Sequence, residues 1–324
     1  MGAAFFDFDG DGLSDFGFSA PAKRGSDLLR HFIYTSSDAA VLDLTTGSVG
    51  DYPAHADLDG DGKTDLVLVH DDGTNLLWNI RFTATGETRS IKFGRSGDTI
   101  ISNCSFLGTT PDLAVLTPAG VLRYRALAGP RGRLRIYKGL AKVKRASCLD
   151  LDGDGSAELL LQLSNFAAAS AAAGSGRARA AASSLRGRAA LVAMNMRGEI
   201  MFMQPLIRTR AIIDIIGLDA SMEGSERPGI LERTALGTRL TLFGKTGAEP
   251  IIFELATNDR IAEVTTARLQ GVSEIENGLF IYSAKNGLEQ FNCESSQRRA
   301  LLFQGDIPAG GTMLNARSSS QTGK

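Results

Sequence analysis

The sequence predicts an all-β protein built from a repeated unit of short strands, and three observations carry this prediction. An aspartate-rich motif occurs three times, at residues 7–15, 57–65 and 150–158. Apolar segments of strand length follow it, and further short apolar or alternating segments are separated by Gly, Asp or Ser. The first two copies start 50 residues apart, and the third starts 93 residues after the second, close to two such steps. A repeat of about 50 residues with four short strands has the length and strand count of a β-propeller blade.

The motif is a nine-residue loop with the pattern D-x-D-G-D-G-x-x-D/E. Weaker copies occupy residues 106–115, 219–231 and 270–282. The loop exits fall near residues 15, 65, 112, 158, 227 and 277, and only the step from 158 to 227 is long. That step contains a low-complexity stretch of Ala, Ser, Gly and Arg at 167–190, and removing it restores the period. We therefore expect one domain over residues 1–324 with a surface-loop insertion at 167–190.

Strands are expected between the loops, at residues 32–34, 40–44, 75–80 and 90–93 among others. A second marker, Gly-Asp followed by a short segment, starts at Gly50, Gly97 and Gly305, just ahead of the loops. Residues 307–314 match the strand that enters each loop, and we expect them to join the sheet that contains residues 16–20. A count of six units plus a terminal strand favours about six four-stranded blades and leaves seven open.

The three strong loops have the ligand chemistry of calcium sites. Calcium prefers six to eight oxygen ligands, and several carboxylates in one short loop repel each other unless a cation lies among them. Glycines at positions four and six permit the tight curl. The expected ligands are the side chains at positions one, three, five and nine and the backbone carbonyl at position seven. These are Asp7, Asp9, Asp11, Leu13 and Asp15; Asp57, Asp59, Asp61, Lys63 and Asp65; and Asp150, Asp152, Asp154, Ser156 and Glu158.

Other interpretations of these loops are weaker. An EF-hand would need a glutamate at position twelve, where Phe18, Leu68 and Leu161 stand, and strand-like residues follow in place of a helix. Magnesium prefers small octahedral sites with several waters. Plain Asp/Gly turns are common on surfaces, but three copies in one register argue against them. In the fifth repeat Asp219 begins a degraded loop and Arg227 replaces the last carboxylate, so we expect no metal there, nor in the third and sixth repeats.

A known family shares these features. The first loop, continued by Asp15-Phe16-Gly17-Phe18-Ser19-Ala20-Pro21, resembles the FG-GAP repeat. The segment from Gly50 to Leu66 is similar to the related VCBS-type repeats of bacterial surface and secreted proteins. The resemblance covers nearly the whole chain and is specific in three repeats. It implies an integrin-α-like β-propeller with calcium in loops on one face; integrin-type propellers have seven blades.

The histidines and Trp78 give little support for catalysis. His31, His55 and His70 share no ligand spacing and are expected to be ordinary surface or loop residues. No nucleophile-elbow, zinc-protease or P-loop motif is found. Trp78 is expected in the core, with a sugar-stacking platform as the alternative.

The three cysteines have a simple structural interpretation. Cys104, Cys148 and Cys293 fit neither a zinc site nor a disulfide framework, and we expect small buried hydrophobes; one disulfide plus one free thiol stays open.

The insertion carries arginines without nearby acids, which favours a solvated loop over a contact with an acidic partner. They are Arg177, Arg179, Arg186 and Arg188.

The expected function is a non-catalytic recognition or adhesion module. Calcium would stiffen the loops, and another face would bind a protein or glycan partner. A net charge of −1 gives no bulk attraction to nucleic acid, and the apolar runs are too short for membrane insertion. A propeller-fold polysaccharide lyase or hydrolase, and a structural scaffold segment of a longer surface protein, are the alternatives. Extracellular calcium modules bind at about 10⁻⁴–10⁻³ M, which favours an extracellular or cell-surface location, although no signal peptide is visible.

Overall fold

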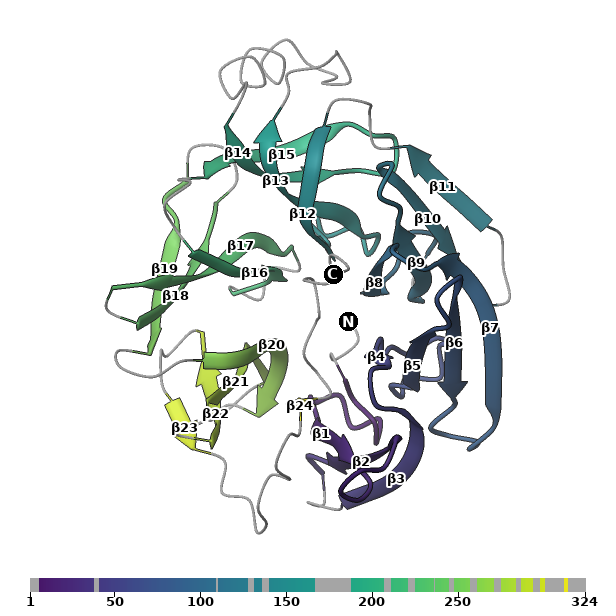
Figure 1. Ribbon diagram of the computed structural model, residues 1–324. Coiled ribbons are helices and arrows are strands. Elements are labelled where there is room, and N and C mark those ends of the chain that lie inside the picture. The colour runs from purple at the N-terminus through teal and green to yellow at the C-terminus, as the bar shows by residue number, and fades with distance from the viewer. Residues whose placement is uncertain are drawn as a thin grey trace. The chain divides into compact units, whose positions relative to one another are not determined.

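The computed structural model describes most of the chain, and every regular element in that part is a β-strand (Figure 1). The described residues are 6–37, 41–108, 110–127, 131–135, 140–166, 188–206, 211–220, 225–235, 237–244, 248–256, 261–270, 275–283, 287–293, 298–300 and 312–313. Within them, no helix is long and apolar enough to cross a membrane. The all-β prediction is confirmed.

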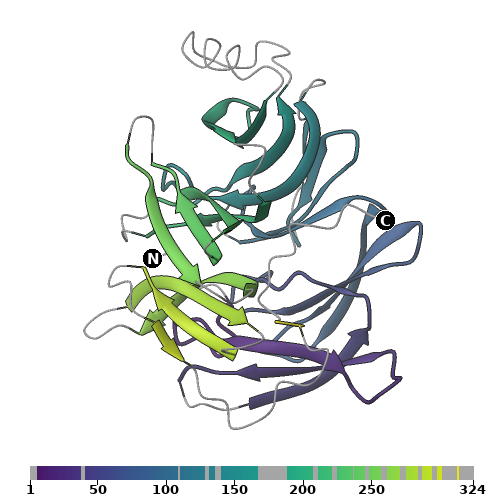
Figure 2. The ribbon, with the colours of Figure 1, turned by 60° about the vertical axis from the view of Figure 1, so that its left-hand side comes forward.

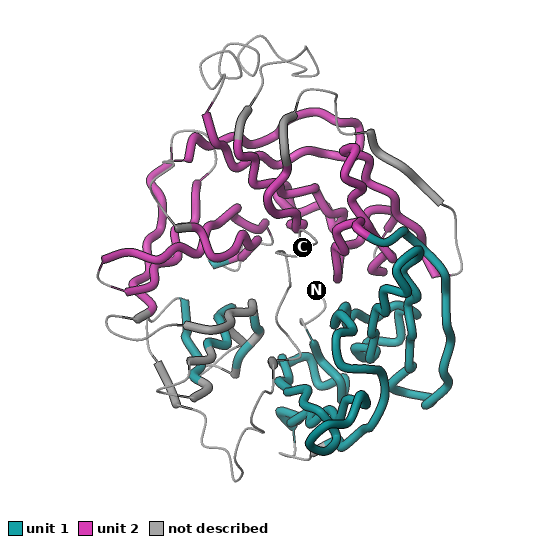
Figure 3. Tube along the Cα trace, in the orientation of Figure 1, with its two compact units in different colours: residues 1–96, 220–222, 260–318 teal, residues 97–219, 223–259, 319–324 magenta. Residues whose placement is uncertain are grey.

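The chain divides into two compact units (Figure 3). One comprises residues 1–96, 220–222 and 260–318, and the other residues 97–219, 223–259 and 319–324. Each contains three four-stranded antiparallel sheets whose order follows the chain, except that the last strand joins the first sheet. Repeated four-stranded meanders of this kind are the blades of a β-propeller fold.

The first unit holds the sheets at the two ends of the chain. Its strands, in sheet order, are β24 (Thr312–Met313), β1 (Phe16–Pro21), β2 (Leu28–Tyr34) and β3 (Val41–Ser48); β4 (Tyr52–Pro53), β5 (Leu66–Asp71), β6 (Asn75–Arg81) and β7 (Thr88–Arg95); and β20 (Ile261–Gln270), β21 (Ile275–Ser283), β22 (Gly287–Asn292) and β23 (Arg298–Ala300).

The second unit holds the middle of the chain. Its strands are β8 (Thr99–Cys104), β9 (Asp112–Leu116), β10 (Val121–Arg125) and β11 (Arg131–Arg135); β12 (Leu140–Leu149), β13 (Glu158–Phe166), β14 (Ala189–Met194) and β15 (Ile200–Leu206); and β16 (Ala211–Leu218), β17 (Arg227–Thr234), β18 (Gly237–Leu242) and β19 (Ile251–Ala256).

The second strand of each sheet explains the apolar runs after the loops. In β13, Leu161 packs into one core cluster with Leu122, whereas its neighbour Leu160 packs into another cluster with Ile215. Consecutive side chains of a strand point to opposite faces, so a strand buried on both faces must be apolar at every position. The third strand β6 is buried only at alternate positions and alternates in sequence accordingly.

The repeat boundaries predicted from the sequence are confirmed. The second strands β1, β5, β9, β13, β17 and β21 begin within two residues of the expected loop exits. The markers at Gly50 and Gly97 precede the first strands β4 and β8, and both glycines have positive φ. The marker at Gly305 and residues 167–187 of the insertion lie outside the described residues. The insertion is shorter than expected, because Ala189 and Ala190 already belong to β14.

The C-terminal strand takes the predicted place. Met313 pairs with Phe18 and Thr312 with Ser19, so β24 is the first strand of the sheet that continues with β1 (Figure 2). The two ends of the chain are therefore held in one sheet.

The cysteines do not all behave as small buried hydrophobes. Cys104 at the end of β8 and Cys148 in β12 form a disulfide across a sequence separation of 44 residues, and Cys293 is a buried free thiol. The single disulfide left open by the sequence is the observed arrangement. The two cysteines stand at nearly equivalent places in neighbouring repeats, which brings them together although they are far apart in the chain.

Removing β24 should destabilise the protein. Deleting residues from Gly305 onward leaves the β1 edge without its partner, and unpaired backbone groups at a sheet edge are costly. We expect a loss of at least about 2 kcal/mol in unfolding free energy, measured by urea denaturation. Deleting only residues 318–324 should change nothing. Equal stability of the two truncated proteins would show that the β24–β1 pairing contributes little.

Breaking the disulfide should also destabilise the protein. The double variant C104S/C148S should lose about 2–4 kcal/mol, because the bond restricts the unfolded chain. A reductant should destabilise the parent protein and leave the double variant unaffected. Detection of three free thiols in the unreduced parent protein would contradict the bond.

Candidate metal centre

The three aspartate loops lie between the first and second strands of their sheets. Residues 57–65 connect β4 to β5, residues 150–158 connect β12 to β13, and residues 7–15 lead into β1. All six glycines at positions four and six have φ between 80° and 91°. A side chain at such positions would be strained, so the glycines permit the tight curl that gathers the aspartates.

The first-position carboxylates hold the loops in shape. Asp7, Asp57 and Asp150 each accept hydrogen bonds from the amides of both loop glycines, with donor–acceptor distances of 2.5–3.0 Å. The position is thus a structural anchor as well as a candidate ligand.

The ninth-position carboxylates are buried beneath the loops. Asp15 and Asp65 are 0% exposed and Glu158 is 4% exposed. Each accepts a hydrogen bond from the amide of the second loop residue, over 2.6, 3.0 and 2.8 Å respectively. The pairing of positions two and nine closes the loop at the start of the second strand.

Burial makes these three carboxyl groups hard to ionise in the absence of a cation. Burial is the largest cause, and together with the negative charges of the other acids in the same loop it raises the pKa of Asp15, Asp65 and Glu158 to about 7. Hydrogen bonds from backbone amides oppose the shift only in part. A cation within the loop would remove the repulsion.

The structure brings together three carboxylates in each loop. Within the groups, one oxygen from each residue lies within 4.8 Å of the others. The groups are Asp7, Asp9 and Asp15; Asp57, Asp59 and Asp61; and Asp150, Asp152 and Glu158. The other three predicted side-chain ligands, Asp11, Asp65 and Asp154, lie outside these groups. The carbonyls of Leu13, Lys63 and Ser156 remain predicted ligands.

Hydrogen-bond donors from another turn of the same sheet complete the loops. In the first, the hydroxyls of Ser36 and Ser37 donate to Asp11 and Asp9, at 2.7 and 2.6 Å. In the second, Thr83 donates its amide to Asp65, at 3.1 Å. Each donor lies in the turn between the third and fourth strands of the same sheet, a part of the repeat that carries no recognisable motif.

The third repeat keeps the loop fold without the acids. Asp112 is 2% exposed and accepts the amides of Phe106 and Leu107, at 2.7 and 3.0 Å, as the ninth-position residue of the other loops does. Burial raises the pKa of Asp112. Its loop has no aspartate at positions one, three and five, so the buried carboxylate has a structural role there even without a metal.

Neighbouring loops are joined by a repeated hydrogen bond that sequence analysis missed. The amide at position eight donates to the carbonyl at position one of the preceding repeat. This bond joins Thr64 to Asp7 at 2.6 Å and Ala157 to Ser105 at 2.8 Å. Glu226 of the fifth repeat likewise donates to Asp150 at 2.6 Å, and its carboxylate accepts the Asp150 amide at 2.9 Å. Residues 221–224 of the fifth loop are outside the described residues.

Two of the histidines are buried: His31 lies in β2, contrary to the expectation of a surface or loop residue, whereas His55 lies in a loop as expected but is not at the surface. His31 is 0% exposed and bonds through its two ring nitrogens to the Ser19 hydroxyl and the Thr46 carbonyl, at 2.7 and 2.8 Å. His55 is 1% exposed, and its Nδ1 accepts the Val67 amide at 2.9 Å. Burial, followed by the nearby His31, lowers the pKa of His55 to about 3, so it is neutral.

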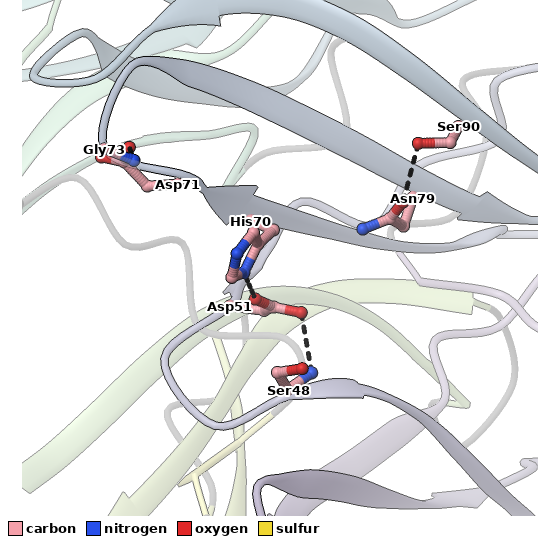
Figure 4. Close-up of polar contacts among 7 residues, drawn as sticks. All are labelled: Ser48, Asp51, His70, Asp71, Gly73, Asn79 and Ser90. Carbon is pink, nitrogen blue, oxygen red and sulfur yellow. Dashed lines mark hydrogen bonds and ion pairs between the residues drawn. The ribbon is translucent and has the colours of Figure 1, made fainter.

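His70 of β5 contacts the turn between β3 and β4. Its Nδ1 lies 2.7 Å from Asp51, whose side chain is 3% exposed and also accepts the Ser48 amide (Figure 4). The Asp51 of the Gly-Asp marker therefore ties the turn after β3 to β5.

Trp78 is 1% exposed and donates its indole N–H to the Phe93 carbonyl, which confirms core packing.

Comparison with known proteins supports the fold alone. No family model and no curated protein matches the sequence. Among solved structures, the chain is similar to a DUF4784 family protein from Bacteroides caccae, with 11% identity, a TM-score of 0.50 and coverage of 91% of this chain and 72% of that chain. It is also similar to AztD from Citrobacter koseri, with 7% identity, a TM-score of 0.42 and coverage of 91% and 84%.

Any metal bound in these loops should compete with protons. In the metal-free protein, the pKa of Asp15, Asp65 and Glu158 lies near 7, above the ordinary carboxyl value. The folded state then holds more protons than the unfolded state between about pH 4 and 7, so its stability falls as the pH rises through this window. We expect calcium to raise the melting temperature more at pH 8 than at pH 5. A shift that is the same at both values would exclude these carboxyl groups as ligands.

Proposed function

We propose that this protein is a calcium-binding, non-catalytic recognition module with three metal loops. The observation that carries the proposal is the clustering of three carboxylates within 4.8 Å in each loop, with a buried carboxylate at position nine beside or within the cluster. Such a set is unfavourable unless a cation shares it, because like charges repel strongly where water is excluded.

The residues fit calcium in particular. All the available ligand atoms are oxygens, and calcium accepts six to eight of them in flexible geometry. In the first loop, Asp7, Asp9 and Asp15 would bind the ion, with Asp11 and the Leu13 carbonyl within the same loop. Corresponding residues of the second and third loops would do the same. The ion would screen the repulsion between the carboxylates and stabilise the loop fold.

The proposed architecture is one domain of six blades related to the FG-GAP and VCBS repeats. It is supported by the six four-stranded sheets and by the β24–β1 pairing. The sequence resemblance in the three strong loops supports a relationship to these repeat families. Calcium loops of this kind would stabilise the scaffold and leave other surfaces to bind a protein or glycan partner.

Two features support an extracellular or cell-surface location as part of this proposal. Calcium sites of this type fill at extracellular concentrations of the ion. The Cys104–Cys148 disulfide also favours an oxidising compartment, since disulfides rarely persist in the cytosol.

Calcium removal tests the proposal. The melting temperature of the chelated protein should be lower than that of the calcium-loaded protein, because each site at tenfold saturation stabilises the folded state by roughly 1.4 kcal/mol. Metal analysis of the loaded protein should find about three calcium ions. An unchanged melting temperature together with no bound metal would refute the proposal.

A matched pair of variants separates metal binding from loop structure. The triple variant D9N/D59N/D152N removes the third-position charge from each metal loop and should abolish most of the calcium shift. The variant D112N alters the buried carboxylate of the loop without acids, so it should leave the shift intact. Equal loss in both variants would mean that the shift reflects general stability.

A further inference from the structure

The three metal loops occupy unequal places in the series of repeats. The first loop, residues 7–15, and the second, residues 57–65, belong to consecutive repeats. The third loop, residues 150–158, follows the third repeat, whose shortened loop ends in Asp112 and has no acid at its earlier positions. A contact between consecutive repeats therefore joins two metal loops in one case, and a metal loop to a loop without an acidic cluster in the other.

A chain of two peptide groups leads from the second loop to the first. The Thr64 amide donates to the Asp7 carbonyl at 2.6 Å. The peptide group that contains this carbonyl also carries the Phe8 amide, which donates to the Asp15 carboxylate at 2.6 Å. At the other end, the Thr64 amide shares its peptide group with the Lys63 carbonyl. This relay therefore begins at a predicted ligand of the second loop and ends at a buried predicted ligand of the first.

The third loop has a matching relay, but that relay leads to a loop without an acidic cluster. The Ala157 amide donates to the Ser105 carbonyl at 2.8 Å. The Phe106 amide of the same peptide group then donates to the Asp112 carboxylate at 2.7 Å. An ion in the third loop would thus act on a structural carboxylate instead of a second metal site.

The relay cannot continue from the third repeat to the second loop. The residue just before Asp112, at the position that Thr64 and Ala157 hold in their loops, is Pro111. Proline has no amide hydrogen to donate. The third loop is therefore not joined to the second by this route, and the first and second loops form a separate pair.

A side-chain contact reinforces the link between the first two loops. The Lys63 side chain lies over Gly10, so closely that a Cβ added to this glycine would meet its Cγ and Cε at 3.3 Å. Gly10 donates its amide to the Asp7 carboxylate at 2.5 Å, so it belongs to the curl that gathers the acids. The second loop therefore touches the first at two points of its backbone, Asp7 and Gly10.

We propose that Thr64 is a positioning residue through which calcium in the second loop strengthens calcium binding in the first. This inference rests on the proposed function and adds the regulation of its metal sites. A cation at the Lys63 carbonyl would polarise the peptide group that contains the Thr64 amide, and hydrogen bonds in series strengthen one another. Asp7 and Asp15 would then be held in place before the first loop is filled, which lowers the ordering cost of binding there.

Repulsion between the two bound ions opposes this effect but is screened. Each of the two loops has four carboxylates in its predicted ligand set, so a loop that holds one divalent ion carries no net positive charge. The hydrogen-bonded contact between the loops therefore decides the sign of the coupling. Because coupling between binding sites is reciprocal, calcium in the first loop strengthens binding in the second by the same factor.

Variants with emptied loops test the coupling. D59N/D61N empties the second loop and D152N/D154N empties the third, by removing the carboxylates at positions three and five. Calcium affinity of the first loop is measured against a chromophoric chelator in three proteins: with the first loop alone, with the second loop added, and with the third added. We expect the second loop to raise the affinity at least about fivefold, the lower end of usual coupling between sites, and the third loop to leave it unchanged.

The outcomes separate this inference from the proposed function. First-loop affinity that is equal or lower when the second loop is intact would refute the inference and leave three independent calcium sites. An equal increase from the second and third loops would also refute it, because the third loop lacks the relay to the first. A parent protein that binds no calcium would refute the proposed function and the inference together.

A proline substitution isolates the role of Thr64. T64P removes the amide that donates to Asp7, as Pro111 does in the third repeat, whereas T64A keeps that amide. We expect the first two loops to bind independently in T64P and to stay coupled in T64A. A157P breaks the matching bond to Ser105, so it controls for the general cost of a proline and should retain the coupling.

The coupling factor is a ratio of two affinities measured in one background, so a general loss of stability does not imitate its loss. Coupling in T64P equal to that of the parent would overturn the assignment to Thr64, as would its loss in A157P. If T64P does not fold, the comparison between emptied loops still decides whether the first two sites are coupled.

Discussion

The buried carboxylate at the ninth position of each loop is the constraint on which the loops depend. It lies at the start of the second strand, where it accepts the amide of the second loop residue and so fixes the loop against the sheet. The third repeat keeps this bond through Asp112 although it has lost the other acids. The hydrogen bond therefore belongs to the fold of the repeat, and the acids around it are an addition that converts a structural loop into a candidate metal site.

The same loops connect one repeat to the next. The amide at position eight reaches the first-position carbonyl of the preceding repeat at 2.6–2.8 Å, so the residue that curls one loop is also the acceptor for its neighbour. Below the loops, leucines on the two faces of β13 pack into different clusters. Loop geometry and sheet packing are thus coupled, and a cation that stabilises a loop would also stabilise the contact between sheets.

Charged residues are spread unevenly along the chain. The aspartates of the three loops lie where a cation could neutralise them, and the Arg30–Asp43 and Arg239–Glu254 pairs neutralise other charges within their own sheets. A protein of near-zero net charge can therefore carry strongly acidic loops, because the local field depends on the local rather than the total charge.

The sequence by itself determined the repeat, the all-β class, the strand that follows each loop and the acidic clusters. These features are local: glycines set the loop curvature, and a strand buried on both faces must be apolar at every position. Tertiary structure decided which residues meet across repeats. It placed Cys104 beside Cys148, buried His31 and His55 in the core, brought Ser36 and Ser37 to the first loop, and set Arg123 opposite Arg133. Such contacts depend on register and on the packing of sheets far apart in the chain, and no local pattern of residue types encodes them.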